Sequence, residues 1–317
     1  MTGRETIAVI GAGLMGHGIA QVFASAGHSV RVFDPQAESL ASLHQRIADN
    51  LVALDQDAGA VDRVSGHPDL SEAVGMADIV FEAAPEKLAL KQSIFADLER
   101  SARPDALLAS NTSVIPIGQI AERVESKNRV VGTHWWNPPF LVPLVEVVQA
   151  DGTSDEAIAR MMALLTSVGK TPVHVKKDIA GFVGNRLQHA LWREAIALVG
   201  EGVCDAETVD TVVKASFGRR LAVLGPLENA DLVGTDLTLD IHNHVLPALD
   251  RTPGPLPIHR EIVAEGRLGM KTGHGFRAWT AEQSDALRQR VTRHLRAMSD
   301  ALDAPQTGNE PENGRKS

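Results

Sequence analysis

The chain has 317 residues, of which 44% are apolar and 22% are charged, a globular composition that excludes disordered, collagen-like and repeat proteins. Its 31 basic and 40 acidic residues give a formal charge of −9 without a basic face, so we expect no nucleic-acid partner. The single cysteine, Cys204, excludes an intrachain disulfide and a cysteine-based zinc site. Because no apolar run approaches a membrane span and no signal peptide is recognisable, we expect a cytoplasmic protein with no membrane partner.

The first half of the chain alternates short β-branched runs with helical repeats, which predicts a mostly parallel sheet connected by helices. A helix is predicted from the glycine cluster after the first strand to Ala26, and a second helical pattern follows Pro35. The predicted strands are residues 7–10, 29–33, 78–82, 106–109, 130–133 and 144–148. We therefore predict an α/β domain over residues 1–180.

The second half has a helical period and few strand signals. Leu187, Leu191 and Leu198 follow a spacing of about four, which predicts an all-α domain over residues 181–302. The apolar faces of such helices indicate self-association, so we expect a homodimer. Residues 303–317 have almost no apolar side chains and are predicted to be disordered.

A glycine-rich turn follows the first predicted strand and opens a helix. Gly11 permits the tight turn, Gly13 lets a pyrophosphate approach the backbone, and Gly16 allows close helix packing. Leu14 and Met15 lie in the first helical turn, whose amides face the anion. This context predicts a Rossmann-type dinucleotide site.

The second predicted strand ends in Asp34, 18 residues after Gly16. A carboxylate there can accept both hydroxyls of an adenosine ribose and would repel a 2′-phosphate, so NAD is favoured over NADP. Two alternatives stay open. Asp34 could merely cap a helix beginning at Pro35, and FAD-binding domains share the glycine pattern.

The segment at residues 130–148 carries the candidate catalytic pair. His134 follows an apolar strand, and Glu146 interrupts the next one after a proline-rich turn. If the turn folds the second strand back beside the first, Glu146 can fix one ring nitrogen of His134 and leave the other as a base. The alternatives are a structural histidine and an exposed glutamate.

Seven motifs lie within residues 7–279, nearly the whole chain: GAGLMGHG at 11–18, SNTS at 110–113, HWWNPP at 134–139, LVEVV at 144–148, GFVGNR at 181–186, GPLE at 225–228 and KTGHGF at 271–276. In these motifs the chain resembles the NAD-dependent 3-hydroxyacyl-CoA dehydrogenase family. That family includes 3-hydroxybutyryl-CoA dehydrogenases and the L-gulonate 3-dehydrogenases related to lambda-crystallin. The resemblance implies a Rossmann-type domain followed by a helical domain, and oxidation of a 3-hydroxyl group to a ketone.

The resemblance also implies the site residues. It makes His134 the catalytic base and Glu146 its partner. Ser113 and Asn185 would hold the reacting oxygen and its neighbouring carbonyl, with Asn137 supporting the site. The alternative for the serine and Asn185 is a capping or loop role.

Two further residues, Glu86 and Lys91, resemble positions that line the cofactor on its nicotinamide and ribose side. The family favours a short-chain 3-hydroxyacyl-CoA such as 3-hydroxybutyryl-CoA as substrate, in fatty acid metabolism. Residues 44–75, however, hold two arginines, no lysine and six acids, which suits CoA phosphates poorly. Arg220 resembles a basic position of the gulonate-type members and could clamp a free carboxylate. The alternatives are therefore a small free 3-hydroxy acid or a non-catalytic NAD-binding protein.

Overall fold

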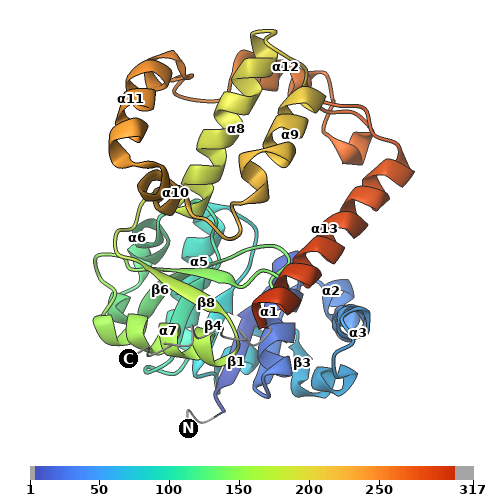
Figure 1. Ribbon diagram of the computed structural model, residues 1–317. Coiled ribbons are helices and arrows are strands. Elements are labelled where there is room, and N and C mark those ends of the chain that lie inside the picture. Colours follow the sequence, from blue (N-terminus) through green and yellow to red (C-terminus); the bar gives the residue numbers. More distant parts are fainter. Residues whose placement is uncertain (1–3, 304–317) are drawn as a thin grey trace, which may run out of the picture. The chain divides into compact units, whose positions relative to one another are not determined.

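The computed structural model describes residues 4–303 (Figure 1). The chain forms two compact units: the first comprises the residues up to Asn185 and those from Ser299 on, and the second comprises Arg186–Met298. Within residues 4–303, no helix is both long and apolar enough to cross a membrane.

The first unit is built on an eight-stranded sheet in the order β3-β2-β1-β4-β5-β6-β7-β8. All neighbouring strands are parallel except β6 and β7, which are antiparallel. The strand order reverses between β1 and β4, and ligands of such sheets bind beyond the carboxyl ends of the strands at this point. The strands are β1 Thr6–Ile10, β2 Ser29–Phe33, β3 Val64–His67, β4 Ile79–Glu82, β5 Leu107–Ser110, β6 Val130–Trp135, β7 Leu144–Val148 and β8 Thr171–Val175.

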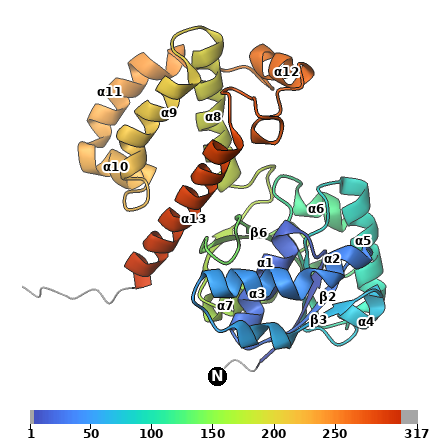
Figure 2. The same ribbon diagram turned by 90° about the vertical axis from the view of Figure 1, so that its right-hand side faces the viewer.

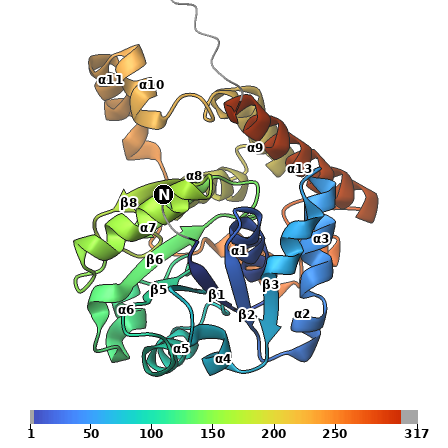
Figure 3. The same ribbon diagram turned by 90° about the horizontal axis from the view of Figure 1, so that it is seen from below.

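Helices cover both faces of this sheet (Figure 3). One face packs on α1 (Leu14–Ser25), α3 (Leu43–Ala53) and α7 (Asp155–Ser167), with α1 and α3 side by side in Figure 2. The other face packs on α4 (Leu70–Val74), α5 (Leu88–Ser101) and α6 (Ile117–Ile120). Because the central strands are buried on both faces, their sequences are nearly continuous apolar runs. This confirms the predicted Rossmann-type fold.

The structure adds two strands that the sequence analysis did not predict. The short edge strand β3 contains Gly66, and β8 contains Pro172 and is largely exposed, so neither forms an apolar run. The predicted helix after Pro35 is two helices, α2 (Ala37–Ala41) and α3, which divide at Ser42.

The second unit is helical, as predicted. Among its described residues, the buried apolar side chains are Ala197 and Ile262, and many others are exposed. In Figure 2, α10 and α11 lie side by side. The helices are α8 Gly184–Gly200, which begins in the first unit, α9 Ala206–Ala215, α10 Pro226–Val233, α11 Thr235–Val245, α12 Pro257–Ala264 and α13 Ala281–Asp303. Residues 304–317 of the predicted disordered tail lie outside the described residues.

Candidate active site

The glycine turn between β1 and α1 is closely packed at Gly11 and Gly16 and open at Gly13. Gly11 has a φ of +103°, and its amide donates to the Phe33 carbonyl at 2.7 Å. A Cβ on Gly16 would lie 1.7 Å from the Gly11 carbonyl oxygen, whereas a Cβ on Gly13 would meet no atom within 4 Å. No side chain caps the first amides of α1, and Leu14 is exposed there. The turn therefore leaves a helix N-terminus and open space for a pyrophosphate.

Asp34 follows β2 and forms a hydrogen bond with the backbone of this turn. Its carboxylate accepts the amide of Ala12 at 2.8 Å and the amide of Gln36 at 2.9 Å. Arg46 on α3 donates to the Ala12 carbonyl at 2.6 Å. Asp34 thus lies at the carboxyl end of β2 beside the glycines, where ribose recognition requires an acid. Its contact with a ribose stays a prediction.

The antiparallel pairing of β6 and β7 places His134 directly opposite Glu146. Directly opposed side chains project to the same face of a sheet, and the two groups meet with Nδ1 2.7 Å from Oε2. Both are buried, with exposed fractions of 4% and 1%. An ionised carboxylate can only accept, so Nδ1 carries the proton and donates. Nε2 has no hydrogen-bond partner among the described residues, and it is left as the basic nitrogen.

The second oxygen of Glu146 is held by the chain that leads into α8. Oε1 accepts the amides of Val183 at 2.9 Å and Gly184 at 3.0 Å. Burial alone would raise the pKa of Glu146, but the hydrogen bonds from His134, Gly184 and Val183 outweigh burial and lower the pKa. Glu146 is therefore ionised at neutral pH, as a partner for an imidazolium must be.

The backbone conformation of the GFVGNR motif directs the amides of Val183 and Gly184 toward Glu146. Gly181 and Phe182 both have positive φ values, of 74° and 48°, which turn the chain sharply before α8. Phe182 is buried with its ring 5.8 Å from the His134 ring. A Cβ on Gly184 would lie 2.5 Å from Cζ2 of Trp136, so only glycine fits between Trp136 and the carboxylate.

Ser113, Asn185 and Glu86 form a second network. Asn185 Nδ2 donates to the Ser113 carbonyl at 2.8 Å. Glu86 Oε1 accepts the Thr112 hydroxyl and the amides of Ser113 and Val114, the latter two at 3.1 and 3.2 Å. Burial opposes ionisation of Glu86, but these bonds and the Lys91 charge lower its pKa. The Ser113 hydroxyl has no hydrogen-bond partner among the described residues, so it is free for a ligand.

Lys91 is fully buried, at 0% exposure, and its Nζ lies 2.7 Å from Oε1 of Glu82 and 3.5 Å from Oε2 of Glu86. The other oxygen of Glu82 accepts the Ser110 hydroxyl at 2.6 Å. Glu82 was not predicted as a site residue, although it ends an apolar strand as Asp34 does. Contact between Lys91 and a cofactor stays a prediction.

The first turn of α8 links the two networks, because Gly184 binds Glu146 while Asn185 binds Ser113. Asn137 is exposed, precedes a cis peptide bond to Pro138, and makes no side-chain hydrogen bond with the described residues. Its predicted role is untested.

Arg220 belongs to the second unit. It is exposed beside a small cavity with Phe217, Leu224 and Asn229, and it forms no ion pair with the described residues. Its predicted contact with a carboxylate is untested.

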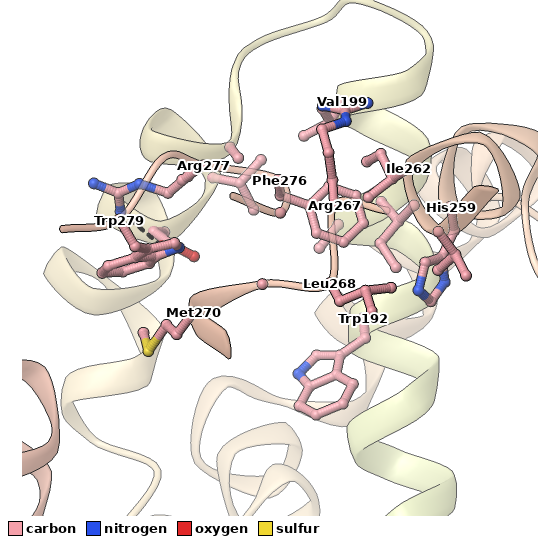
Figure 4. Close-up of a pocket in the computed structure, with 18 of the residues that line it drawn as sticks. Trp192, Val199, His259, Ile262, Arg267, Leu268, Met270, Phe276, Arg277 and Trp279 are labelled. Atoms are coloured by element: carbon pink, nitrogen blue, oxygen red, sulfur yellow. Dashed lines mark hydrogen bonds and ion pairs between the residues drawn. The ribbon is translucent and has the colours of Figure 1, made fainter. Parts of the chain in front are cut away.

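The second unit also has a larger, mostly apolar cavity of about 640 Å³ (Figure 4). Trp192 of α8 and Phe276 line it, and Trp279 lies beside the Arg277 guanidinium, which pairs with Asp210 at 3.1 Å. None of the predicted site residues lines this cavity.

The structure defines a dinucleotide-binding oxidoreductase. It combines a sheet in Rossmann order, an uncapped helix N-terminus after a glycine turn, and a buried histidine bonded to an ionised acid. Two family models match the chain: "3-hydroxyacyl-CoA dehydrogenase, NAD binding domain" over residues 6–179, and "3-hydroxyacyl-CoA dehydrogenase, C-terminal domain" over residues 181–279. The chain belongs to the 3-hydroxyacyl-CoA dehydrogenase family.

Similar curated proteins differ in the substrates that their names state. The chain is 35% identical to 5-formyl-3-hydroxy-2-methylpyridine 4-carboxylate 5-dehydrogenase of Mesorhizobium japonicum, over 94% of this chain and 98% of the relative. It is 40% identical to a probable 3-hydroxybutyryl-CoA dehydrogenase of Bacillus subtilis, over 86% and 96%.

Solved structures agree with this relationship. A crystal structure of the pyridine carboxylate dehydrogenase, described as an NAD+-dependent dismutase, matches with a TM-score of 0.88 at 32% identity, over 95% of this chain and 99% of that chain. (S)-3-hydroxybutyryl-CoA dehydrogenase from Ralstonia eutropha matches with a TM-score of 0.73 at 33% identity, over 88% and 100%. The protein is thus an NAD-dependent dehydrogenase acting on CH–OH groups, and the open glycine turn fits the cofactor.

Proposed function

We propose that His134 is the general base of this dehydrogenase. Its Nε2 takes the proton of a substrate hydroxyl, and bound NAD supplies the hydride acceptor for the carbon that bears this hydroxyl. In the reverse direction the imidazolium returns the proton. The observation that carries the proposal is the buried 2.7 Å contact between His134 Nδ1 and Glu146 Oε2, which fixes the tautomer with a free Nε2.

Polar groups around this pair would orient the substrate and the cofactor. The Ser113 hydroxyl and the Asn185 amide can hold the reacting oxygen and its neighbouring carbonyl without changing charge, and Asn137 would support them. The residues proposed to bind NAD are Gly11, Gly13, Leu14, Met15, Gly16, Asp34, Glu86 and Lys91. Among these, Asp34 would accept the ribose hydroxyls.

Replacing the base tests the proposal. We expect His134→Gln to lower the rate of single-turnover hydride transfer, followed at 340 nm, by about 10²–10⁴-fold, because proton transfer by a positioned side chain contributes that much. NADH affinity should be unchanged. His174→Gln is the matched control, since His174 is an exposed histidine on β8. An unaltered hydride-transfer rate in His134→Gln would refute the assignment.

For the substrate, we propose a small free hydroxy carboxylate. The scarcity of basic residues and the six acids at residues 44–75 disfavour a ligand with several phosphates. The relative that the chain matches over 94% of its length is named for a free pyridine carboxylate. Arg220, exposed and without an ion pair among the described residues, can bind a carboxylate through two parallel hydrogen bonds.

A short-chain 3-hydroxyacyl-CoA such as 3-hydroxybutyryl-CoA is the second candidate and would place the enzyme in fatty acid metabolism. The 40% identity to a probable 3-hydroxybutyryl-CoA dehydrogenase favours it. Relative turnover of acetoacetyl-CoA and free 3-oxo acids with NADH separates the candidates. For a free acid, we expect Arg220→Met to raise KM about tenfold or more, and the neighbouring Arg219→Met to leave it unchanged. Turnover of acetoacetyl-CoA alone would refute our choice.

We also propose a homodimer formed through the second unit. Exposed apolar side chains such as Leu187, Leu227, Leu232 and Ile241 would be removed from water by a second copy of the chain. Sedimentation velocity at micromolar concentration should give a dimer, and Leu232→Glu should shift the protein toward monomer. A monomeric wild type would refute this. We further propose a cytoplasmic location, which the single cysteine supports.

A further inference from the structure

The loop at residues 136–143 follows β6, the strand that carries His134, and packs against α1, the helix of the glycine turn. It connects β6 to β7, so it leaves the site directly after His134. A Cβ on Gly18 of α1 would lie 2.9 Å from Cδ of Pro139 and 3.4 Å from Cδ1 of Phe140, so this loop packs closely on α1. A shift of the loop would therefore displace Asn137 and alter the contact with α1.

Lys170 fastens this loop from the turn between α7 and β8. It follows Gly169, whose φ of +76° turns the chain, and its Nζ donates to the Pro139 carbonyl at 2.5 Å and to the Val142 carbonyl at 3.2 Å. The same ammonium lies 5.8 Å from the ring centroid of Trp135. A single charged group thus holds two carbonyls of the loop against an aromatic side chain of β6.

No carboxylate of the described residues forms an ion pair with Lys170. Burial lowers its pKa to about 8, so the folded protein binds the Lys170 proton less tightly than an unfolded chain does. Burial of the charge therefore costs free energy of folding, and the hydrogen bonds to the two loop carbonyls and the contact with the Trp135 ring offset part of that cost. The favourable contacts of the ammonium are thus with the loop and with the ring of β6.

We propose that Lys170 is a positioning residue, whose ammonium holds the 136–143 loop in the arrangement that aligns substrate and cofactor at His134. The inference rests on the proposed function for its catalytic consequence. Its structural part, an ordered loop, is measurable without any substrate.

The test compares Lys170→Met and Lys170→Arg with Lys176→Met, an exposed lysine beside β8, as control. In Lys170→Met we expect an unfolding midpoint at pH 7 close to that of wild type, because the substitution removes the desolvation penalty and the two carbonyl hydrogen bonds together. Amide hydrogen exchange in residues 136–143 should be faster, because the amides of Leu141 and Val142 are bonded to Pro138 within the loop. We expect kcat to fall by about ten- to a hundredfold, since small displacements of reacting groups have effects of that order.

Lys170→Arg keeps the charge and should restore much of kcat. It should also lack the loss of activity that we expect in wild type as pH rises through about 8 and Lys170 loses its proton. Unchanged exchange in 136–143 of Lys170→Met would overturn the inference, and so would faster exchange with kcat within twofold of wild type. If Lys170→Met does not fold, Lys170→Arg and the wild-type pH profile decide. A wild type inactive on all hydroxy substrates would refute the proposed function, and loop exchange would still decide the placement of the loop.

Discussion

Replacing Glu146 with glutamine changes one oxygen to an amide group and tests the proposed base directly. The carboxylate accepts three hydrogen bonds, from His134 on one oxygen and from the amides of Val183 and Gly184 on the other. A glutamine has one acceptor oxygen and one donor nitrogen, so it cannot satisfy both sides.

The two orientations of the glutamine have unequal cost. If its nitrogen faced the two backbone amides, both of these buried donors would lose their acceptor, at about 1–3 kcal/mol each. If its nitrogen faces His134 instead, both amide bonds survive, and Nδ1 must become an acceptor. The second orientation therefore has the lower free energy. It moves the ring proton to Nε2, the nitrogen that must be unprotonated to act as the base.

We therefore expect Glu146→Gln to fold and to bind NADH normally while kcat falls by about 10³–10⁴-fold. A comparable amide replacement in a serine protease triad, which also produces the wrong tautomer, lowers kcat about 10⁴-fold. The assay is NADH formation at 340 nm under single-turnover conditions, with Glu156→Gln on the exposed side of α7 as control. A rate within threefold of wild type would refute the tautomer argument and the role of His134 as base.

Three further predictions follow from the same structure. Asp34→Ser should weaken NADH binding about ten- to a hundredfold and lower the ratio of NADH affinity to NADPH affinity, both measured by fluorescence titration. An unchanged ratio would contradict the ribose assignment. Gly184→Ala should lower the free energy of unfolding in urea by about 1–3 kcal/mol, because its Cβ would lie 2.5 Å from Trp136, and equal stability would show that the turn relaxes. The pKa of Glu86 is lower in the folded chain, so its stabilising contribution exists above pH 4.5 and disappears as pH falls through the folded pKa. The difference in unfolding free energy between wild type and Glu86→Gln should shrink in acid, and a pH-independent difference would contradict this.

Local patterns carried most of the fold prediction. The glycine turn at residues 11–16 and the acid at Asp34 are fixed by short-range geometry, so their positions could be inferred without coordinates. The edge strands β3 and β8 could not be, because Gly66 and Pro172 interrupt them and pairing with neighbouring strands creates them. Pairing with neighbouring strands therefore determines these two edge strands, and the strand propensity of their residues does not.

Within the site, the sequence indicated the histidine and its acid but not the groups that hold them. The Val183 and Gly184 amides reach Glu146 across 37 and 38 residues, and no spacing rule predicts such contacts. The contact of Lys91 with a cofactor stays a prediction, and its burial against Glu82 was not predicted from the sequence. Burial of a charge pair depends on packing around it, which a residue list does not contain.

The β6–β7 hairpin has a consequence for how this enzyme can diverge. His134 and Glu146 lie twelve positions apart and face each other through strand register alone. A slip by one residue would turn the acid to the opposite face, whereas substitutions in the connecting loop leave the register intact. Side-chain changes within residues 136–143 can therefore alter the surroundings of the proposed proton-transfer pair without moving it, as long as the carbonyls bound by Lys170 keep their positions.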